Sequence, residues 1–358
     1  MKNIAIIIGD ISRSAGTERA VTNLSNMLVK YGEYNVTILS CFSSENNNPY
    51  YELEDKVNIV HYNLSKDSLV NRFSSYINII GKTNKIIKEK SIDILLGTTH
   101  AFNCLMICMS RKVKKVACEH MSYEACPLIS KKIRKFCYPR LSAIVLLTNA
   151  DAKHYYFVDK SKLFVIPNSL SFVADEPAKL ENKRIIAVGR LTEQKGFDIL
   201  MSIAQIIKDE IPDWHIDIFG DGEDKSKLLE LIFEKKLESF VTINPPTKNI
   251  KEELLASSLF VMTSRWEGLP MILLEAKACG LPIVSFDCPE GPADVIKDCE
   301  DGFLNEMADL RKFSDKICSL AKNDTLRNMM GEKSFNNALC FLDINIFKLW
   351  DSLFNRIN

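Results

Sequence analysis

The sequence predicts an α/β protein built from two successive, doubly wound parallel-sheet domains. The chain has 358 residues, about twice the length of an ordinary single domain. Short β-branched runs alternate with stretches of helical periodicity, and most of these runs are apolar throughout, as in strands buried on both faces of a parallel sheet. The alternation stops at a polar stretch with two prolines, residues 167–183, which we interpret as a linker, and then restarts.

Twelve strands are expected from these apolar runs. Seven belong to a first domain, residues 1–168, and five to a second domain, residues 184–340. Helices of 3.6-residue periodicity fill most of the gaps between them. The expected strands are residues 3–9, 36–41, 57–62, 92–99, 115–120, 143–148 and 163–168, then 184–189, 214–220, 240–245, 259–264 and 282–287.

Composition and charge exclude several classes of function. Lys plus Arg and Asp plus Glu number 46 each, so the whole chain has no net attraction to nucleic acid. The eleven cysteines include no CxxC pair and the N-terminus soon becomes polar, which indicates a reducing cytoplasm rather than secretion. Cys104 and Cys108 lack a second pair to complete a zinc site, so we expect them to be buried apolar residues. No run of about 18 apolar residues predicts a membrane span.

Two loops that follow strands could bind phosphate. Gly16 precedes a helix after the first strand, and Arg190 and Lys195 precede a helix after the first strand of the second domain. Guanidinium, ammonium and free helix-start amides together suit a diphosphate. A simple helix entry at Gly16 and two solvated cations are the open alternatives. Gly9 and Gly16 are seven apart, a spacing that disfavours a dinucleotide cofactor.

Two glutamates stand in the apolar stretch 263–282. Glu267 falls in a loop after a strand, and Glu275 on the helix that follows. A carboxylate accepts two hydrogen bonds from vicinal hydroxyls, as on a ribose or a hexose, while the helix-start amides from Leu269 to Met271 can face a diphosphate. A surface helix glutamate and a loop glutamate remain the alternative. The acidic run 219–225 is better explained as a turn and helix start than as a metal site.

These motifs together resemble one enzyme family. The run "EGLPMILLEA", with "GRLTEQKG" and "GDG" before it and "CGLPIVSFDCPEGP" after it, is similar to the nucleotide-sugar half of the retaining family 4 glycosyltransferases of the GT-B fold. The resemblance covers residues 184 to about 335. In the first domain, "AGTERAV" is similar to the family's glycine loop, with Ala15 in place of a glycine. It implies two Rossmann-like domains with a cleft between them, and a C-terminal helix of about 341–358 that packs back on the first domain.

The resemblance also implies roles for individual residues. Arg190 and Lys195 match the pair that binds the donor diphosphate, Glu275 the residue that holds the ribose hydroxyls, and Glu267 the one that contacts the transferred sugar. Leu269-Pro270 stands where the family often has Phe-Gly, and Pro270 removes one backbone donor. The expected donor-binding set is Gly16, Arg190, Lys195, Glu267, Gly268, Leu269, Met271 and Glu275, and the expected catalytic set is Glu267, Arg190, Lys195 and His120.

His120 is the leading histidine because it ends a strand of the first domain and resembles the histidine that many family members place beside the donor sugar. His100 is the second candidate, and a satisfied turn residue is the alternative for both. The remaining three histidines, His61, His154 and His215, are expected to be structural. In the family the β-phosphate leaving group takes the acceptor proton, so no cofactor and no metal are expected beside the two cations.

Residues 111–140 form a local basic segment. They contain nine Lys or Arg against two Glu, together with Tyr123, Phe136 and Tyr138. A solvated face explains part of this excess, and an anionic membrane suits such a surface better than nucleic acid, because no nucleic-acid module accompanies it. We therefore expect peripheral contact with the inner face of the cell membrane and a saccharide acceptor on a polyprenyl diphosphate.

The expected function is transfer of a hexose or N-acetylhexosamine (Gal, GalNAc, Glc or GlcNAc) from a UDP-sugar to that acceptor with retention, in surface polysaccharide biosynthesis. Two alternatives remain open. A UDP-sugar epimerase of the same architecture would convert its substrate without an acceptor. A non-enzymatic sugar-nucleotide-binding protein would not need the full set of phosphate and carboxylate positions.

Overall fold

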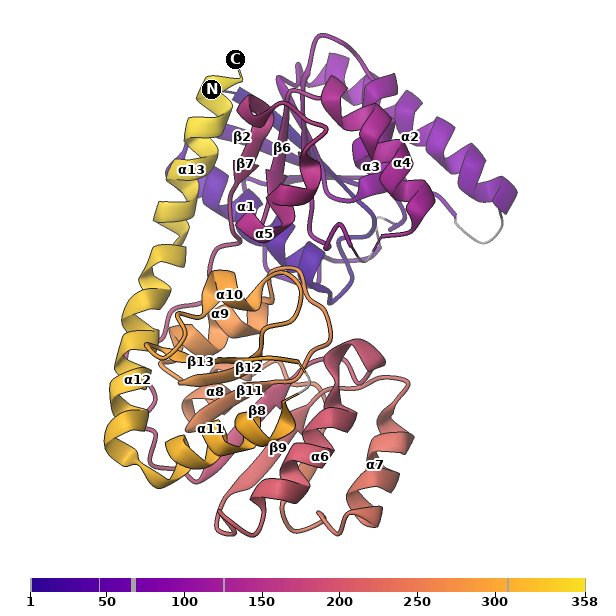
Figure 1. The fold of residues 1–358 in the computed structure, drawn as a ribbon. Coiled ribbons are helices and arrows are strands. Elements are labelled where there is room, and N and C mark those ends of the chain that lie inside the picture. Colours follow the sequence, from indigo (N-terminus) through magenta and orange to yellow (C-terminus); the bar gives the residue numbers. More distant parts are fainter. Residues whose placement is uncertain (1, 45, 66–68, 125, 308, 358) are drawn as a thin grey trace. The chain divides into compact units, whose positions relative to one another are not determined.

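The computed structural model describes residues 2–44, 46–65, 69–124, 126–307 and 309–357. It divides the chain into two compact units (Figure 1). The first contains Met1–Ser169 and Asp343–Asn358, and the second contains Leu170–Leu342. Each unit is built around one parallel sheet and is described separately.

The first unit has a seven-stranded sheet in the order β3-β2-β1-β4-β5-β6-β7. All neighbouring strands are parallel, and β1 lies between β2 and β4, where the strand order reverses. This arrangement confirms the predicted doubly wound class. The strands are β1 (Lys2–Ile8), β2 (Tyr34–Ser40), β3 (Asn58–His61), β4 (Ile94–Gly97), β5 (Lys114–Cys118), β6 (Ala143–Leu146) and β7 (Leu163–Val165).

Helices cover both faces of this sheet, which explains why its strands are apolar throughout. Ile4, Ile6 and Ile8 pack toward α1 and α13, whereas Ala5 and Ile7 pack in a second core on the other face. Figure 1 shows α1 and α13 on one side and α2, α3 and α4 on the other. The helices are α1 (Gly16–Tyr31), α2 (Leu69–Glu89), α3 (His100–Leu105), α4 (Leu128–Cys137), α5 (Asn149–Ala152) and α13 (Asp343–Arg356).

The C-terminal helix α13 belongs to the first unit. Its apolar stripe, which includes Ile346, Trp350 and Leu353, lies in the same buried cluster as the β1 isoleucines. The Tyr34 hydroxyl, at the start of β2, donates a 2.6 Å hydrogen bond to Asp351 Oδ1 on the polar face of the helix. The apolar stripe of this helix therefore packs against β1 and β2, which lie more than 300 residues earlier in the chain.

The second unit has a six-stranded parallel sheet in the order β10-β9-β8-β11-β12-β13. Its first five strands in sequence were predicted, but β13 (Gly302–Asn305) was missed. Its short sequence, with glycine at one end and asparagine at the other, gives almost no strand signal, and it lies at the edge of the sheet beside β12. The other strands are β8 (Arg184–Val188), β9 (His215–Phe219), β10 (Val241–Asn244), β11 (Leu259–Met262) and β12 (Ile283–Phe286).

One face of the second sheet packs with the buried faces of α6 and α11 in a core of aliphatic and aromatic side chains. The helices of the second unit are α6 (Phe197–Ile207), α7 (Lys225–Glu234), α8 (Ile250–Leu255), α9 (Met271–Ala278), α10 (Pro292–Val295), α11 (Leu310–Lys322) and α12 (Asp324–Ala338). Short 3-10 helices are η1 (Met106–Cys108), η2 (Tyr138–Arg140), η3 (Lys153–Tyr155), η4 (Lys160–Lys162), η5 (Glu193–Lys195) and η6 (Leu339–Phe341).

The polar stretch 167–183 is not a free linker. From Leu170 onward it belongs to the second unit and packs there as irregular chain. The Ala178 amide donates to the Cys279 carbonyl over 2.8 Å, and Arg327 Nε donates to the Leu180 carbonyl over 3.1 Å. Prolines and polar residues predicted the absence of regular structure, but they carry no information about these backbone anchors.

Candidate functional site

The turn after β8 brings one expected cation to the edge of the second sheet. The chain runs from β8 through η5, which ends at Lys195, and Gly196 is then the N-cap of α6, with φ of +63°. A Cβ atom on Gly196 would lie 2.1 Å from the Thr263 carbonyl oxygen, in the loop after β11. Glycine is therefore required here both for its left-handed backbone and for the close approach of the two loops.

Side chains fasten the same two loops together. Arg265 forms a bidentate ion pair with Asp198 over 2.9 and 2.7 Å, and its backbone amide donates to the Gln194 carbonyl over 2.8 Å. The Gln194 side chain donates to the Trp266 carbonyl over 3.0 Å. The hydrogen bonds from Arg265 lower the pKa of Asp198. Sequence reasoning missed this ion pair, because its two members are separated by 66 positions of the chain.

As a result, Lys195 and Glu267 meet. Lys195 Nζ donates to Glu267 Oε1 over 2.6 Å, and the two side chains are 16% and 7% exposed. A charge-assisted hydrogen bond of this length between two largely buried groups is strong, yet the lysine has three donors and the carboxylate has further acceptor sites. The structure thus brings together a cation predicted to bind phosphate and a carboxylate predicted to bind a sugar.

Arg190 lies on the same turn but points into solvent. Arg190 is exposed, and its Nη2 atom lies 3.5 Å from Gln194 Oε1. A long guanidinium on an exposed loop can move toward a ligand without first breaking a strong contact. The two expected phosphate-binding cations therefore differ: Lys195 is held in place, whereas Arg190 is held only weakly.

The loop before α9 is packed from two sides. Leu269 is buried, Met271 is the first helical residue, and Pro270 precedes it at the N-cap, where its missing N–H breaks no helical hydrogen bond. Gly291 has φ of +99°, and a Cβ atom there would lie 1.9 Å from the Gly268 carbonyl oxygen, so the loop after β12 rests on the 266–270 loop. The N-terminal amides of α9 are thus held at the edge of the sheet.

Glu275 is buried on α9, one helical turn after Met271, at 1% exposure. It stands among Leu274, Ala276 and other buried apolar residues. The alternative of a surface helix glutamate is therefore wrong for this position. A glutamate is rarely buried to this degree unless a specific interaction balances the cost of desolvating its charge.

In the first unit, Gly16 is the first residue of α1 and is exposed. Ala15 occupies the N-cap with extended backbone and supplies no side-chain cap, which leaves the first-turn amides accessible. A Cβ atom on Gly16 would meet no heavy atom of the described chain within 4 Å. The neighbouring residues of the first unit thus do not require glycine at this position.

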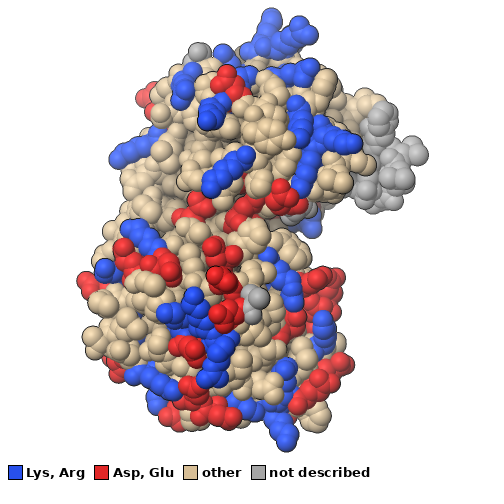
Figure 2. Space-filling view, viewed as in Figure 1, with Lys and Arg blue, Asp and Glu red and all other residues tan. Residues whose placement is uncertain are grey.

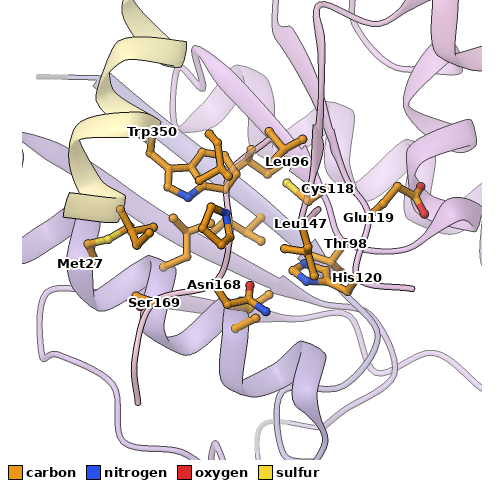
Figure 3. A pocket seen from close by; sticks show the side chains of 18 residues that line it. Met27, Leu96, Thr98, Cys118, Glu119, His120, Leu147, Asn168, Ser169 and Trp350 are labelled. Atoms are coloured by element: carbon orange, nitrogen blue, oxygen red, sulfur yellow. The ribbon is translucent and has the colours of Figure 1, made fainter. Parts of the chain in front are cut away.

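His120 follows β5 and lines a small, mostly apolar cavity at the carboxyl ends of the first sheet. Figure 3 shows its ring beside Thr98 and Leu147, with Asn168 nearby and Trp350 on the far side. Its Nδ1 atom is buried and has no hydrogen-bond partner among the described groups. Burial lowers the pKa of His120 to about 4, so the imidazole is neutral near pH 7. Its neighbour Glu119 points away from the ring.

The second histidine candidate, His100, begins α3, and its pKa is lowered by burial and by the charge of Arg134. The other three histidines all contact polar side chains. His61 Nδ1 lies 2.8 Å from Ser43 Oγ, His154 Nδ1 lies 3.3 Å from a carboxylate oxygen of Glu124, and His215 Nε2 lies 2.8 Å from Thr242 Oγ1.

A buried ion pair behind His120 was missed. Arg134 Nη2 lies 3.0 Å from Glu119 Oε2, and both side chains are almost completely inaccessible. Asn103 donates to Glu119 over 2.8 Å, the Tyr138 hydroxyl donates to the same carboxylate, and Arg134 Nη1 donates to the Tyr155 hydroxyl over 3.3 Å. In the sequence, Arg134 is one cation among many in a basic run, and nothing there distinguishes it.

The basic segment 111–140 therefore does not present all of its charge to solvent. Arg134 is buried, and Lys115 is buried with its ammonium donating to the Met109 carbonyl over 2.9 Å. Lys131 pairs with Glu124 over 2.9 Å. Two of the nine cations, Arg134 and Lys115, therefore stabilise the interior of the unit and are not part of a basic surface.

No described helix combines the length and apolar character needed to cross a bilayer. Among the same described residues, no group of three or more His, Cys, Asp or Glu is arranged to hold a metal ion. The acidic run 219–225 leads into α7 with Asp224 at the N-cap, and its glycines allow close backbone contact: a Cβ atom on Gly222 would lie 2.3 Å from the Leu191 carbonyl oxygen.

Comparisons with known proteins agree with this arrangement. The family model of the glycosyl transferases group 1 matches residues 171–337. The amylovoran biosynthesis glycosyltransferase AmsD of Erwinia amylovora is 33% identical over 99% of this chain and 100% of its own length. The Campylobacter jejuni GalNAc-α-(1→4)-GalNAc-α-(1→3)-diNAcBac-PP-undecaprenol α-1,4-N-acetyl-D-galactosaminyltransferase is 28% identical over 94% of this chain and 93% of its own.

The fold is shared with a solved structure of Staphylococcus aureus TarM in complex with fondaparinux, α-GlcNAc-glycerol and UDP, with a TM-score of 0.84. That comparison covers 99% of this chain and 100% of the TarM chain at 17% identity. The two parallel-sheet units therefore have the GT-B glycosyltransferase fold. Because AmsD matches the chain along almost its whole length, the chain belongs to the group 1 glycosyltransferase family.

Proposed function

We propose that this protein transfers a hexose or N-acetylhexosamine from a UDP-sugar to a saccharide acceptor with retention of the anomeric configuration. The observation that carries this proposal is the contact between Lys195 and Glu267 beside the N-termini of α6 and α9, with Glu275 buried one turn further on. Cations, helix amides and carboxylates at one sheet edge match the phosphates and hydroxyls of a nucleotide sugar.

Each group has a role in this proposal. Lys195 and Arg190 neutralise the diphosphate, with Gly268, Leu269 and Met271 offering backbone amides, and Glu275 accepts from the ribose hydroxyls. Glu267 accepts from hydroxyls of the transferred sugar, while Lys195 holds its carboxylate in position. The second unit, within residues 184–340, is the nucleotide-sugar domain. The first unit, within 1–168 together with the C-terminal helix, is the acceptor-binding domain in this proposal, and Gly16 and His120 are the residues assigned to it.

The reaction breaks the bond between the anomeric carbon and the β-phosphate oxygen and joins that carbon to the acceptor oxygen on the same face. The acceptor proton passes to the departing β-phosphate, so UDP and the lengthened saccharide are the products. Lys195 stabilises the charge that grows on the leaving group, a contribution of about 3 kcal/mol for a well-placed donor. Two cations and the helix ends balance this charge, so the mechanism proposed here needs no metal and no cofactor.

The proposed acceptor is a saccharide on a polyprenyl diphosphate at the cytoplasmic face of the cell membrane, and the proposed pathway is surface polysaccharide biosynthesis. Two named relatives support this choice: AmsD is named for amylovoran biosynthesis, and the Campylobacter enzyme for an undecaprenyl-diphosphate-linked substrate. The uridine nucleotide is supported by the UDP bound in TarM. Nucleic acid is not a proposed partner.

The test is a screen of UDP-sugars for UDP release with and without lipid-linked saccharides, followed by NMR of the product to read the anomeric configuration. Release that depends on an acceptor and yields an α-linked product from an α-linked donor supports the proposal. Conversion of the UDP-sugar without an acceptor indicates an epimerase instead, and binding without conversion indicates a sensor. Activity lost in a chelator and restored by magnesium contradicts the metal-free mechanism.

A further inference from the structure

The helix α4 exposes apolar side chains that a soluble helix normally buries. Leu128 is 76% exposed, Ile129 72%, Ile133 48% and Phe136 58%. Its buried side instead contains Arg134. We propose that this face of α4 inserts into an anionic lipid bilayer and anchors the protein there, with the helix axis parallel to the membrane plane.

The spacing of these residues forms a continuous stripe. Ile129, Ile133 and Phe136 follow the i, i+4, i+7 pattern that places side chains along one helix face. The opposite face is fixed, because Arg134 is held by Glu119 and cannot rotate outward without breaking a buried ion pair. The stripe is therefore held facing away from the core of the first unit.

The charges around the stripe favour an anionic bilayer over a protein partner. Residues 126–140 contain no Asp or Glu, and Lys132 and Lys135 are exposed on α4 beside the stripe. Lys135 Nζ lies 2.7 Å from the hydroxyl of the exposed Tyr156, which adds an amphipathic ring to the same surface. Figure 2 shows Lys and Arg side chains among uncharged surface on the part of the first unit where Figure 1 labels α4. Apolar and basic groups on one helix are typical of helices that lie in a membrane interface.

The helix α7 also exposes apolar side chains and can be compared with α4. Leu229 and Phe233 on α7 are 49% and 74% exposed, but Glu230 and Glu234 stand beside them on the same helix. These carboxylates cancel the charge of Lys225 and Lys227 on the same helix, so α7 offers no net attraction to an anionic surface. The inference for α4 thus depends on the combination of apolar stripe and unopposed lysines, and α7 supplies a matched control.

This inference rests on the proposed function, which places the acceptor at the membrane. It assigns the membrane contact to burial of apolar side chains rather than to charge alone. Attraction through charge alone would be released by salt, since the Debye length falls to about 3 Å at 1 M. Burial of apolar side chains persists at high salt. Among the described cations of α4, Lys132 and Lys135 are the surface lysines that pair with no carboxylate, because Arg134 is buried and Lys131 pairs with Glu124.

The first experiment measures vesicle co-sedimentation without donor or acceptor, using phosphatidylglycerol–phosphatidylcholine vesicles at low and high salt. The triple variant Ile129→Gln, Ile133→Gln, Phe136→Gln should lose about a hundredfold or more in affinity at both salt concentrations, and glutamine preserves helix propensity. The double variant Lys132→Gln, Lys135→Gln should lose up to about thirtyfold, and only at low salt. The α7 variant Leu229→Gln, Phe233→Gln should bind as the unchanged protein does. Thermal unfolding checks that all variants are folded.

The second experiment locates the helix. Phe136→Trp should add fluorescence that shifts to the blue on vesicle binding and is quenched by brominated acyl chains, whereas Phe233→Trp on α7 should add fluorescence that does neither. Failure of the unchanged protein to bind anionic vesicles at low salt overturns the proposal. Self-association that the α4 glutamines abolish, without vesicle binding, also overturns it and assigns the stripe to a protein interface.

The outcome is separable from that of the proposed function. Vesicle binding through α4 in a protein that transfers no sugar leaves this inference intact and contradicts the glycosyltransferase proposal. If the α4 glutamine variant loses vesicle binding but transfers sugar to a short soluble acceptor unchanged, both proposals are supported, and α4 serves attachment alone. The α4 glutamine variant should therefore retain transfer to a soluble acceptor while slowing transfer to a lipid-linked one.

Discussion

In each unit a carboxylate that follows a strand pairs with a cation, but these two ion pairs differ in their surroundings. In the first unit, Glu119 and Arg134 are enclosed and share further hydrogen bonds with Asn103, Tyr138 and Tyr155. In the second unit, Lys195 and Glu267 contact each other in a partly accessible loop region, at 16% and 7% exposure.

This difference separates a structural pair from a pair that can exchange partners. Glu119 and Arg134 have most of their hydrogen-bonding capacity used inside the protein, so a ligand would have to displace several contacts at once. Lys195 has two donors beyond its bond to Glu267, and its side chain is partly exposed. An ion pair of this second kind can reorganise around a ligand at modest cost.

The largest effect that tests this comparison is on stability. Glu119→Gln leaves the Arg134 charge buried without its partner, and we expect the free energy of unfolding of the first unit to fall by about 3 to 5 kcal/mol. Glu267→Gln, as the matched control, should cost less, about 1 to 2 kcal/mol, because Lys195 is partly exposed to water. Urea unfolding followed by circular dichroism measures both. Equal losses in the two variants would contradict the distinction between the pairs.

The second effect is on turnover. Lys195→Ala should lower kcat by about 10² to 10³, because negative charge on the leaving group increases toward the transition state and a donor of this type contributes about 3 kcal/mol. UDP affinity should fall less than kcat. A decrease in affinity as large as the decrease in kcat would mean that Lys195 binds the ground state and the transition state equally well.

The same comparison explains what the sequence could predict. The doubly wound class was predicted correctly, and the structure contains all twelve expected strands, because apolar runs buried on both faces give a strong local signal. Lys195 and Glu267 were singled out because each follows a strand, where ligand sites of such sheets lie. Their mutual contact was not predicted, since it depends on Arg265, Asp198 and the approach of Gly196 to Thr263.

Other features gave no usable signal. Arg134 has the same local sequence context as its exposed neighbours, and only the tertiary position of Glu119 explains its burial. Likewise β13 is defined by its pairing with β12 rather than by its own residues. The α4 stripe differs from both. An amphipathic helix ordinarily buries its apolar face, whereas the apolar face of α4 is exposed in the structure.

The third effect concerns the nucleotide. If Glu275 accepts from two ribose hydroxyls, Glu275→Ala should weaken UDP binding by about 2 to 4 kcal/mol, or about 30- to 1,000-fold, through loss of charge-assisted hydrogen bonds. Glu267→Gln should leave UDP binding nearly unchanged but lower turnover of the UDP-sugar. Calorimetry with UDP alone separates the two roles, and unchanged UDP affinity in Glu275→Ala would contradict the ribose assignment.

The smallest effect concerns His120, whose buried ring is neutral, whereas the neighbouring Glu119 and Arg134 form a charged pair. Its pKa is lowered to about 4 in the folded protein, against about 6.5 when unfolded, so the unfolded chain binds more protons between these values. Stability contributed by the neutral ring is thus present above pH 6.5 and is lost as the pH falls toward 4. From pH 7 to pH 5 this loss amounts to at most about 2 kcal/mol.

His120→Asn, which cannot titrate, should show a correspondingly smaller decrease in the free energy of unfolding over that interval. The two proteins are compared by urea unfolding at pH 7, 6 and 5, and parallel pH dependences would mean that the imidazole is reached by water and titrates normally.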